Sequence, residues 1–409
     1  MSAKYRMNNN MNVRSMDTPL NIGDLVFYEL HNSTKLQYIY DNENDFKEEI
    51  AKDERKMRRK NKNYKASAHF QKILNNSVKP PELEGTEYSY NVVTYNKGRN
   101  SNGKGRWYSK NGVGLQSLCG CVRSTICDGL YIDYDQSNSH PSILYHFMLK
   151  YNFNCPLLIE CITNREEFLK KVDKDRDTAK DQIIALINGH EYYKPILTEF
   201  ASQIKPLRDF LINLPEYKED LDYIKKTYPN DDNIKGKTIS RILQYVENDI
   251  LECHINFLHQ KDLIMTAEYN GVKGLQVCLI FDGFMPRINP NITDDVIQEM
   301  RQHTKDTLGV DMPIKIKPFD NKLKLPDNYA ECNETIPALI NKFSIGINDF
   351  VNNNQDIIQR AIESDGAHAD VSKVAHTLLK NSIVYDPKAK RWFYCNPQNV
   401  WKDEEQPNI

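Results

Sequence analysis

The sequence predicts an α+β fold organised around a small, mostly antiparallel β-sheet. Residues 88–95 and 275–281 are rich in β-branched and aromatic side chains, which is typical of strands. Residues 175–188 and 238–258 have the length and apolar spacing of helices. Because strand-like and helix-like segments of this kind alternate through the middle of the chain, the mixture indicates an α+β architecture.

The composition is that of a globular protein and argues against several classes. Of the 409 residues, 40% are hydrophobic and 27% are charged. The nine cysteines form no C-x-x-C pair, which argues against a disulfide framework and a zinc module. Apolar runs are too short to cross a membrane and no signal segment opens the chain, so we expect a soluble intracellular protein. The 54 Lys and Arg residues balance 56 Asp and Glu, so only local clusters can indicate nucleic-acid binding.

Four regions are expected along the chain. Residues 1–20 are polar and predicted to be disordered, and residues 21–90 form an N-terminal accessory region. Residues 91–330 form the core, and residues 339–409 form a small C-terminal domain. The accessory region contains a cationic run that is equally typical of a solvated helix and of an arm contacting phosphates: Arg55, Lys56, Arg58, Arg59, Lys60, Lys62 and Lys65.

Local signals predict further elements. Aromatic and apolar residues favour strands within 25–40, and another strand is expected at 130–135. An apolar helix should follow at 141–149, and Asn164 is a plausible start for the next helix. The helix expected at 175–188 should stop at Gly189.

Asp133 and Asp135 are the first candidate for chemistry. Side chains alternate along a strand, so both carboxylates are expected on one face. Two carboxylates at the exposed end of a buried strand suit a hard cation such as Mg²⁺, which prefers carboxylate oxygens together with water and phosphate. Taken alone, the pair is more typical of a strand that runs into an Asp-rich turn.

Asp282-Gly283 follows a buried-strand candidate and is the second candidate. Asp-Gly is the preferred two-residue hairpin turn, so a purely structural role explains it well. The same hairpin would lift the Asp282 carboxylate out of the sheet, where it could face Asp133 across a pair of metal ions.

A third candidate lies on the 175–188 helix. Four side chains recur at intervals of four and share a face: Arg176, Lys180, Ile184 and Asn188. A cationic pair near a helix start suits polyphosphate binding better than helix stability. A solvated face with Asp177 and Asp181 as ion-pair partners is an equally good interpretation.

A glycine-rich stretch around Arg106 and Trp107 is the fourth candidate. Cations interleaved with an aromatic side chain suit a nucleic-acid backbone and stacked bases. The chain contains no G-x-x-x-x-G-K-[ST] pattern, so no ATP-binding P-loop is expected within it.

In this order, the segments resemble the core motifs of family A nucleic-acid polymerases, the family of bacterial DNA polymerase I and the single-subunit phage RNA polymerases. The first family motif is matched, with one inserted residue, at Gly105, Arg106, Ser109, Leu115, Gln116 and Arg123. The later motifs are matched at residues 133–139 (motif A), at Arg176, Lys180 and Gly189 (motif B), at Gln244 and Asp249, and at Phe281-Asp282-Gly283 (motif C). The resemblance implies a polymerase palm with an antiparallel sheet and helical fingers, and a thumb-like role for residues 21–90.

The departures from the family pattern concern the nucleotide site. Ile184 stands where the family has an aromatic, and Asn188 replaces a Tyr. Asn138 replaces the Glu that helps DNA polymerases exclude the ribose 2′-OH, and Gly283 replaces the carboxylate after the motif C Asp. These changes leave sugar selection open.

The phrase D-x-D-x-x-N-x-H-P, from Asp133 to Pro141, is similar to the divergent transposon–virus polymerase branch. In that branch the polymerase is often fused to a poxvirus-type superfamily 3 primase-helicase. The segment 339–409 is similar to the region that precedes such a helicase, which implies a replicative helicase in cis or in trans.

The resemblance implies template-directed nucleotidyl transfer by a DNA polymerase or primase-polymerase of a viral or mobile-element replication system. Two Mg²⁺ or Mn²⁺ ions would be held by Asp133 and Asp282, with Asp135 as a further ligand or as the register alternative to Asp133. The substrate contacts implied are Arg176 and Lys180 on the triphosphate, Lys180 also as proton donor to pyrophosphate, Asn138 on the sugar, and Arg106 and Gln244 on the DNA primer–template. A primase and a catalytically inactive nucleic-acid-binding module of a primase-helicase assembly remain the alternatives.

Overall fold

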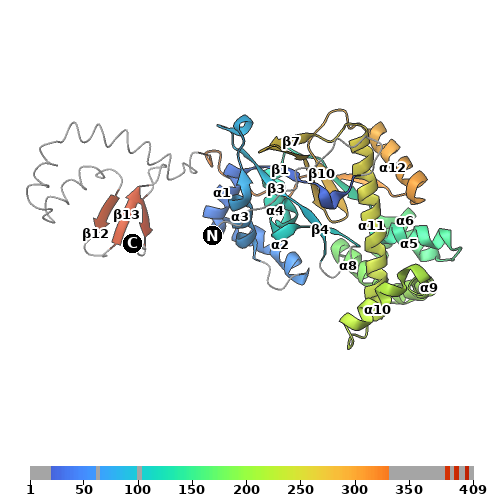
Figure 1. Ribbon diagram of the computed structural model, residues 1–409. Coiled ribbons are helices and arrows are strands. Elements are labelled where there is room, and N and C mark those ends of the chain that lie inside the picture. Colours follow the sequence, from blue (N-terminus) through green and yellow to red (C-terminus); the bar gives the residue numbers. More distant parts are fainter. Residues whose placement is uncertain are drawn as a thin grey trace, which may run out of the picture. The chain divides into compact units, whose positions relative to one another are not determined.

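The computed structural model describes residues 20–60, 65–98 and 104–330, together with three C-terminal strands. The side chains of residues 54–60 and of those strands are outside this description, as are residues 1–19, Lys62 and the rest of 339–409. The expected N-terminal disorder and most of the cationic run therefore lie outside the described residues. The chain divides into two compact units, Met1–Lys324 and Leu325–Ile409 (Figure 1). The boundary expected at residue 90 stays a prediction.

The first unit contains the antiparallel sheet that the sequence predicts. Four strands pair in the order β11-β6-β10-β9, and every pair is antiparallel. They are β6 (Asp133–Gln136), β9 (Val277–Ile280), β10 (Gly283–Pro286) and β11 (Ile314–Lys317). β6 starts later than the strand expected at 130–135, because Tyr131 makes only an isolated bridge to Arg287.

The β9–β10 hairpin turns one residue earlier than the expected Asp282-Gly283 turn. Ile280 pairs with Gly283, so the turn residues are Phe281 and Asp282, and Phe281 has a φ of +53°. Gly283 belongs to β10, where an added Cβ would lie 2.4 Å from the carbonyl oxygen of Tyr134. The close approach of β6, and not the turn, therefore requires glycine at this position.

A second sheet joins the N-terminal region to the middle of the chain. Its order is β2-β3-β1-β8-β7, with β1 antiparallel to β3 and parallel to β8. The strands are β1 (Phe27–Asn32), β2 (Ser77–Val78), β3 (Tyr88–Val93), β7 (Thr266–Tyr269) and β8 (Val272–Leu275). The strand expected at 88–95 is confirmed as β3, and β4 (Tyr95–Lys97) pairs with β5 (Trp107–Ser109) in a separate antiparallel pair.

The expectation of strands throughout 25–40 is only half right. β1 ends at Asn32, whose side chain accepts a hydrogen bond from the Lys35 amide and caps the next helix. Leu36 and Ile39, three residues apart, are then fully buried on one helix face. The helices of this region are α1 (Ser33–Asp41), α2 (Lys47–Lys60), α3 (Ala66–Asn76) and α4 (Gly120–Cys127).

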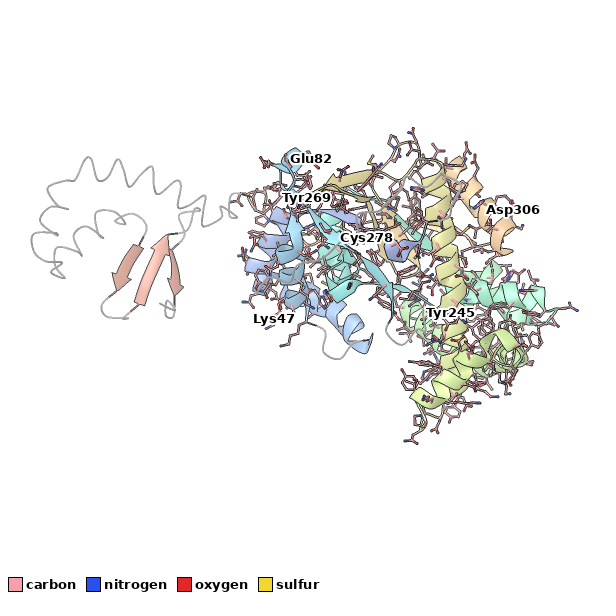
Figure 2. The ribbon with its side chains drawn as sticks, viewed as in Figure 1. Lys47, Glu82, Tyr245, Tyr269, Cys278 and Asp306 are labelled. Atoms are coloured by element: carbon pink, nitrogen blue, oxygen red, sulfur yellow. The ribbon has the colours of Figure 1, made fainter. Side chains whose placement is uncertain are left out.

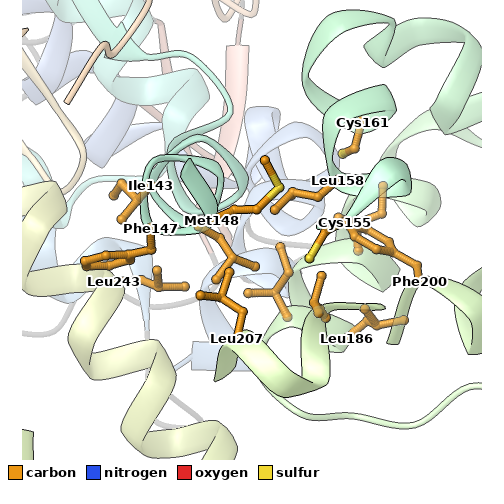
Figure 3. Packing of buried hydrophobic residues seen from close by; sticks show 14 of the residues in the cluster. Ile143, Phe147, Met148, Cys155, Leu158, Cys161, Leu186, Phe200, Leu207 and Leu243 are labelled. Atoms are coloured by element: carbon orange, nitrogen blue, oxygen red, sulfur yellow. The ribbon is translucent and has the colours of Figure 1, made fainter. Parts of the chain in front are cut away.

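Helices form the other part of the first unit. The helices are α5 (Ser139–Lys150), α6 (Pro156–Thr163), α7 (Arg165–Val172), α8 (Arg176–Ile187), α9 (Pro195–Leu211), α10 (Lys218–Thr227), α11 (Ile234–Gln260) and α12 (Asp294–Leu308). The long helix α11 runs beside α8, α9 and α10 (Figure 1). An apolar core joins α5, α6, α8, α9 and α11, and Figure 3 shows Phe147, Leu186, Leu207 and Leu243 within it. Short 3₁₀ helices complete the description: η1 (Ile22–Asp24), η2 (Glu43–Phe46), η3 (Pro81–Leu83), η4 (Lys110–Gly112), η5 (Leu115–Ser117) and η6 (Pro215–Tyr217).

The helix signals in the sequence are largely confirmed. The Asp175 side chain caps α8 by accepting from the Thr178 amide at 2.6 Å, and Gly189 follows the helix with a φ of +86°. Asn164 precedes α7, although its side chain makes no cap hydrogen bond. α11 begins at Ile234, four residues before the expected start, and Asn233 caps it by accepting from the Gly236 amide.

A buried carboxylate connects the two sheets. Glu29 on β1 is fully buried and accepts hydrogen bonds from the Tyr95 hydroxyl and, at 2.6 Å, from the Leu115 amide. The Tyr95 hydroxyl also lies 3.8 Å from the sulfur of Cys278 on β9. Figure 2 marks the place of Cys278 in the molecule. Burial raises the pKa of Glu29, and these hydrogen bonds oppose that rise. Through Tyr95, these contacts connect β1 of the N-terminal region to β9, the strand that precedes Asp282.

The described part of the second unit includes an antiparallel sheet. β12 (Ile383–Asp386), β13 (Arg391–Cys395) and β14 (Trp401–Glu404) pair in that order. Strands thus occupy part of the 339–409 segment, while the helical patterns expected there lie outside the described residues. In the part of the chain that is described, every helix is too short or too polar to cross a membrane.

Candidate active site

The β9–β10 hairpin places Asp282 beside β6. Gly283 lies directly opposite Asp135, and the Gln136 amide donates to the Asp282 carbonyl oxygen at 3.4 Å. Since neighbouring strands of a sheet lie only about 4.8 Å apart, this register sets the two carboxylate-bearing residues side by side. Asp135 is 6% exposed, so one member of the pair is firmly buried.

The charge of Asp135 acts electrostatically on both Asp133 and Asp282. Burial, and then the charges of Glu247 and Asp135, raise the pKa of Asp282 to about 6. Burial also raises the pKa of Asp133, with a further upward contribution from Asp135 and an opposing one from Lys317. The charge of Asp135 therefore raises the pKa of both other aspartates. The role of Asp133 as a metal ligand stays a prediction, and the strand register brings Asp135 next to the hairpin.

Two lysines on β11 face these acids, and the sequence interpretation missed them. Lys317 Nζ lies 2.6 Å from Asp135 Oδ1, and Lys315 Nζ lies 3.7 Å from Asp135 Oδ2. The alternating sequence Ile314-Lys315-Ile316-Lys317 was the available signal, because it predicts a strand with both lysines on one face. Nothing local shows that this strand lies beside β6.

A buried ion pair supports the hairpin from α11. Glu247 is fully buried, and both of its oxygens lie 2.8 Å from Arg106 Nη2. His140 Nε2 lies 3.3 Å from the same carboxylate. Burial by itself raises the pKa of Glu247, but the hydrogen bond from His140 and the charge of Arg106 outweigh it and lower the net pKa. The Arg106 guanidinium also lies 5.8 Å from the centre of the Phe281 ring, at the turn.

The predicted primer–template contacts lie close to this pair. Arg106 donates to the Glu247 carboxylate, and its positive charge partly opposes the rise in the pKa of Asp282 that burial causes. Gln244 is half-buried on α11, one turn before Glu247, and its amide donates to the Ser240 hydroxyl at 3.3 Å. Their contact with primer–template stays a prediction.

A small pocket lies between the start of α5 and helices α6 to α8. Asn138, Lys180 and Ile184, predicted from separate motifs, all line it. Asn138 has a left-handed backbone (φ +57°) and its side chain does not cap α5. The remaining lining residues are Pro141, Cys161, Arg165, Leu169 and Ile183.

The cations of the predicted phosphate face are separated by the structure. Arg176 is exposed and donates to Glu166 at 2.8 and 2.6 Å, outside the pocket lining. Lys180 lies in the lining, 3.3 Å from Asp177. Arg165, at the start of α7, was not foreseen, and burial lowers its pKa, whereas the charge of Asp135 raises it. A half-buried guanidinium in a pocket wall is suited to an anionic ligand.

The donor set fits a cation that takes only part of its ligands from protein. Within residues 20–330, where they are described, no group of three His, Cys, Asp or Glu side chains could hold a metal ion. Mg²⁺ commonly uses one or two carboxylates and completes its shell with water and substrate phosphates. Asp135 and Asp282 supply hard oxygen ligands of that kind.

Comparisons with known proteins identify distant similarities. No protein-family model matches the chain. The chain is 27% identical over 301 residues to "Putative helicase V13" of the Sputnik virophage, an alignment that covers 68% of this chain and 37% of V13. The chain therefore corresponds to little more than a third of that relative. Among solved structures it is similar to the POL domain of Pol1 from M. smegmatis in complex with DNA primer-template and dNTP, at a TM-score of 0.43 and 14% identity, over 62% of this chain and 50% of the other.

Proposed function

We propose that the chain is a template-directed nucleotidyltransferase, a DNA polymerase or primase-polymerase of a viral or mobile-element replication system. The observation that carries the proposal is the register of β6 against the β9–β10 hairpin. It sets Asp135 beside Asp282, and Asn138, three residues after Asp135, lines a pocket with cations in its wall. Buried paired carboxylates next to a cationic pocket are the combination that phosphoryl transfer to a hydroxyl requires.

Asp135 and Asp282 would hold two Mg²⁺ or Mn²⁺ ions, and Asp133 would be an additional ligand. Such ions supply Lewis-acid activation of a primer 3′-hydroxyl and stabilise the leaving pyrophosphate. In support, the pKa of Asp282 is raised to about 6 by burial and by the charges of Glu247 and Asp135. Crowded carboxylates of this kind gain most from a bound cation.

Lys180 and Arg165 would bind the triphosphate of the incoming nucleotide. Both line the pocket, whereas Arg176 is held by Glu166 outside it. Lys180 would also supply a proton to the departing pyrophosphate, as its ammonium has donors to spare beyond Asp177. Arg106 would act chiefly by fixing Glu247 and the hairpin, and Gln244 would contact primer–template nearby.

Ribonucleotide use is part of the proposal, since Asn138 is shorter and uncharged compared with a Glu at that place. A smaller side chain leaves room beside the sugar, so a primase activity is the favoured second function. V13 carries a helicase name, which supports a helicase link in cis or in trans and a helicase-proximal role for residues 339–409. Residues 21–90 would serve as the thumb-like accessory region.

The test is primer extension with Mg²⁺ or Mn²⁺, with dNTPs or NTPs, and with or without a primer. Asp282→Asn and Asp135→Asn should each lower the rate by about a hundredfold or more. Asp133→Asn should have a smaller effect, because Asp133 lies two residues further along β6 from the residue that faces the hairpin. Asp128→Asn is the matched control, since Asp128 forms a half-exposed pair with Lys322 at 2.7 Å.

The outcome distinguishes the alternatives. Synthesis that needs a primer eliminates the primase, and synthesis without one supports it. If wild type and Asp282→Asn bind primer–template equally and neither extends it, the enzyme proposal is wrong and the nucleic-acid-binding module is supported.

A further inference from the structure

Strand β11 places two ammonium groups against the proposed cation ligand. Lys315 lies directly opposite Asp135 and Lys317 lies opposite Asp133 in the antiparallel β11–β6 pair. Opposed residues of such a pair share a face, so both lysines share a face with both acids. Lys317 reaches diagonally to Asp135, at 2.6 Å, and Lys315 is 3.7 Å from the other oxygen of the same carboxylate.

The two ends of these contacts differ in their freedom to move. The Asp135 side chain is 8% exposed, while the side chains of Lys317 and Lys315 are 45% and 52% exposed. Among the described strands β11 lies at the edge of its sheet, and both lysine side chains are about half exposed to water. A lysine is a flexible point charge, and an ion pair with one solvent-facing end is weak enough to be exchanged.

We infer that Lys317, assisted by Lys315, is an internal counter-ion of Asp135 that a divalent cation must displace. The inference rests on the proposed function, because it takes Asp135 as a cation ligand. While the Lys317 ammonium is bound to the Asp135 carboxylate, a divalent cation cannot take the same place on it. The ion pair must therefore break before the cation binds, which lowers the affinity for the cation by the free energy of that ion pair. Divalent-ion occupancy then depends on the triphosphate, whose oxygens add ligands.

The test measures cation binding directly. Mn²⁺ is titrated into the full chain, and free Mn²⁺ is followed by its electron paramagnetic resonance signal. Lys317→Met should tighten Mn²⁺ binding about fivefold, which corresponds to an ion pair of about 1 kcal/mol. Lys315→Met should have a smaller effect, and Lys317→Arg should leave binding at or below the wild-type affinity, because its forked guanidinium holds a carboxylate more strongly.

Lys322→Met is the matched control, because Lys322 is an equally exposed lysine that pairs with Asp128 in the same part of the chain. If Lys317→Met and Lys322→Met both bind Mn²⁺ as the wild type does, and Asp135→Asn abolishes binding, the counter-ion inference is wrong while the proposed cation site stands. If Asp135→Asn binds Mn²⁺ as tightly as the wild type, the proposed cation site is refuted and the inference with it.

Discussion

Replacement of Gly283 by alanine should separate the two strands that carry the candidate acids. An added Cβ would lie 2.4 Å from the Tyr134 carbonyl oxygen, whereas ordinary contacts begin at 3.4 Å. The strands must therefore separate by about 1 Å. The hydrogen bond from the Gln136 amide to the Asp282 carbonyl oxygen is already 3.4 Å long, so this separation would break it. Overpacking of this kind costs about 1–3 kcal/mol of unfolding free energy. The shift also moves Asp282 away from Asp135, so we expect nucleotidyl transfer to fall more steeply than stability.

Denaturant unfolding and primer extension on the same preparation test this. Gly271→Ala is the matched control, because Gly271 also lies at a hairpin, with a φ of +74° and nothing within 4 Å of an added Cβ. It should lose about 1 kcal/mol through backbone strain alone and keep its activity. Equal denaturation midpoints and equal extension rates for Gly283→Ala and wild type would refute the strand register and the reasoning built on it.

Three further predictions concern buried or half-buried charges. Glu247→Gln leaves Arg106 facing a neutral amide and should lower the free energy of unfolding by about 3–5 kcal/mol, measured by denaturant titration. The pKa of Asp282, raised to about 6 in the folded state from an ordinary 3.8, should make stability fall as pH rises from about 4 to about 6, and Asp282→Asn should remove this slope. Arg165→Ala should raise the nucleotide KM more than Arg176→Ala does, because only Arg165 lines the pocket.

Each of these has a clear contrary result. Glu299→Gln breaks only an exposed pair with Lys261 and should cost under about 1 kcal/mol, so an equal loss in Glu247→Gln would contradict the buried-pair assignment. A pH slope that persists in Asp282→Asn belongs to another group. If Arg176→Ala raises the nucleotide KM more than Arg165→Ala does, the phosphate contact lies on the Arg176 and Lys180 face that the helical spacing predicts.

Much of the fold follows from signals that act within a few residues. The Asp175 cap, the Gly189 stop and the β-branched composition of 88–93 predict elements that the structure contains. Such signals are reliable because capping and strand propensity depend on adjacent backbone groups. The same reasoning failed at 33–41, where the burial of Leu36 and Ile39 makes a helix of a segment with strand-like composition.

The candidate site could be predicted only in part, because its residues come from distant segments. Asp135, Asp282, Lys180 and Asn138 were found through motif order and spacing. Glu247, Lys317 and Arg165 were missed, since a mid-helix Glu, an edge-strand Lys and a helix-start Arg have ordinary local roles. Their place in the candidate site depends on contacts between residues far apart in the sequence. Arg106 and Glu247 are 141 residues apart, and Asp135 and Lys317 are 182 residues apart.

The sequence by itself determined the α+β class, the order of the motifs and the kinds of side chain offered for chemistry, because each depends on composition and short-range spacing. Only the tertiary structure decided which aspartate meets the hairpin, which cation lines the pocket and which ammonium faces the acid. A shift of one residue in strand register moves a carboxylate to the other face of a sheet, and no local pattern specifies the register between strands that are more than a hundred residues apart.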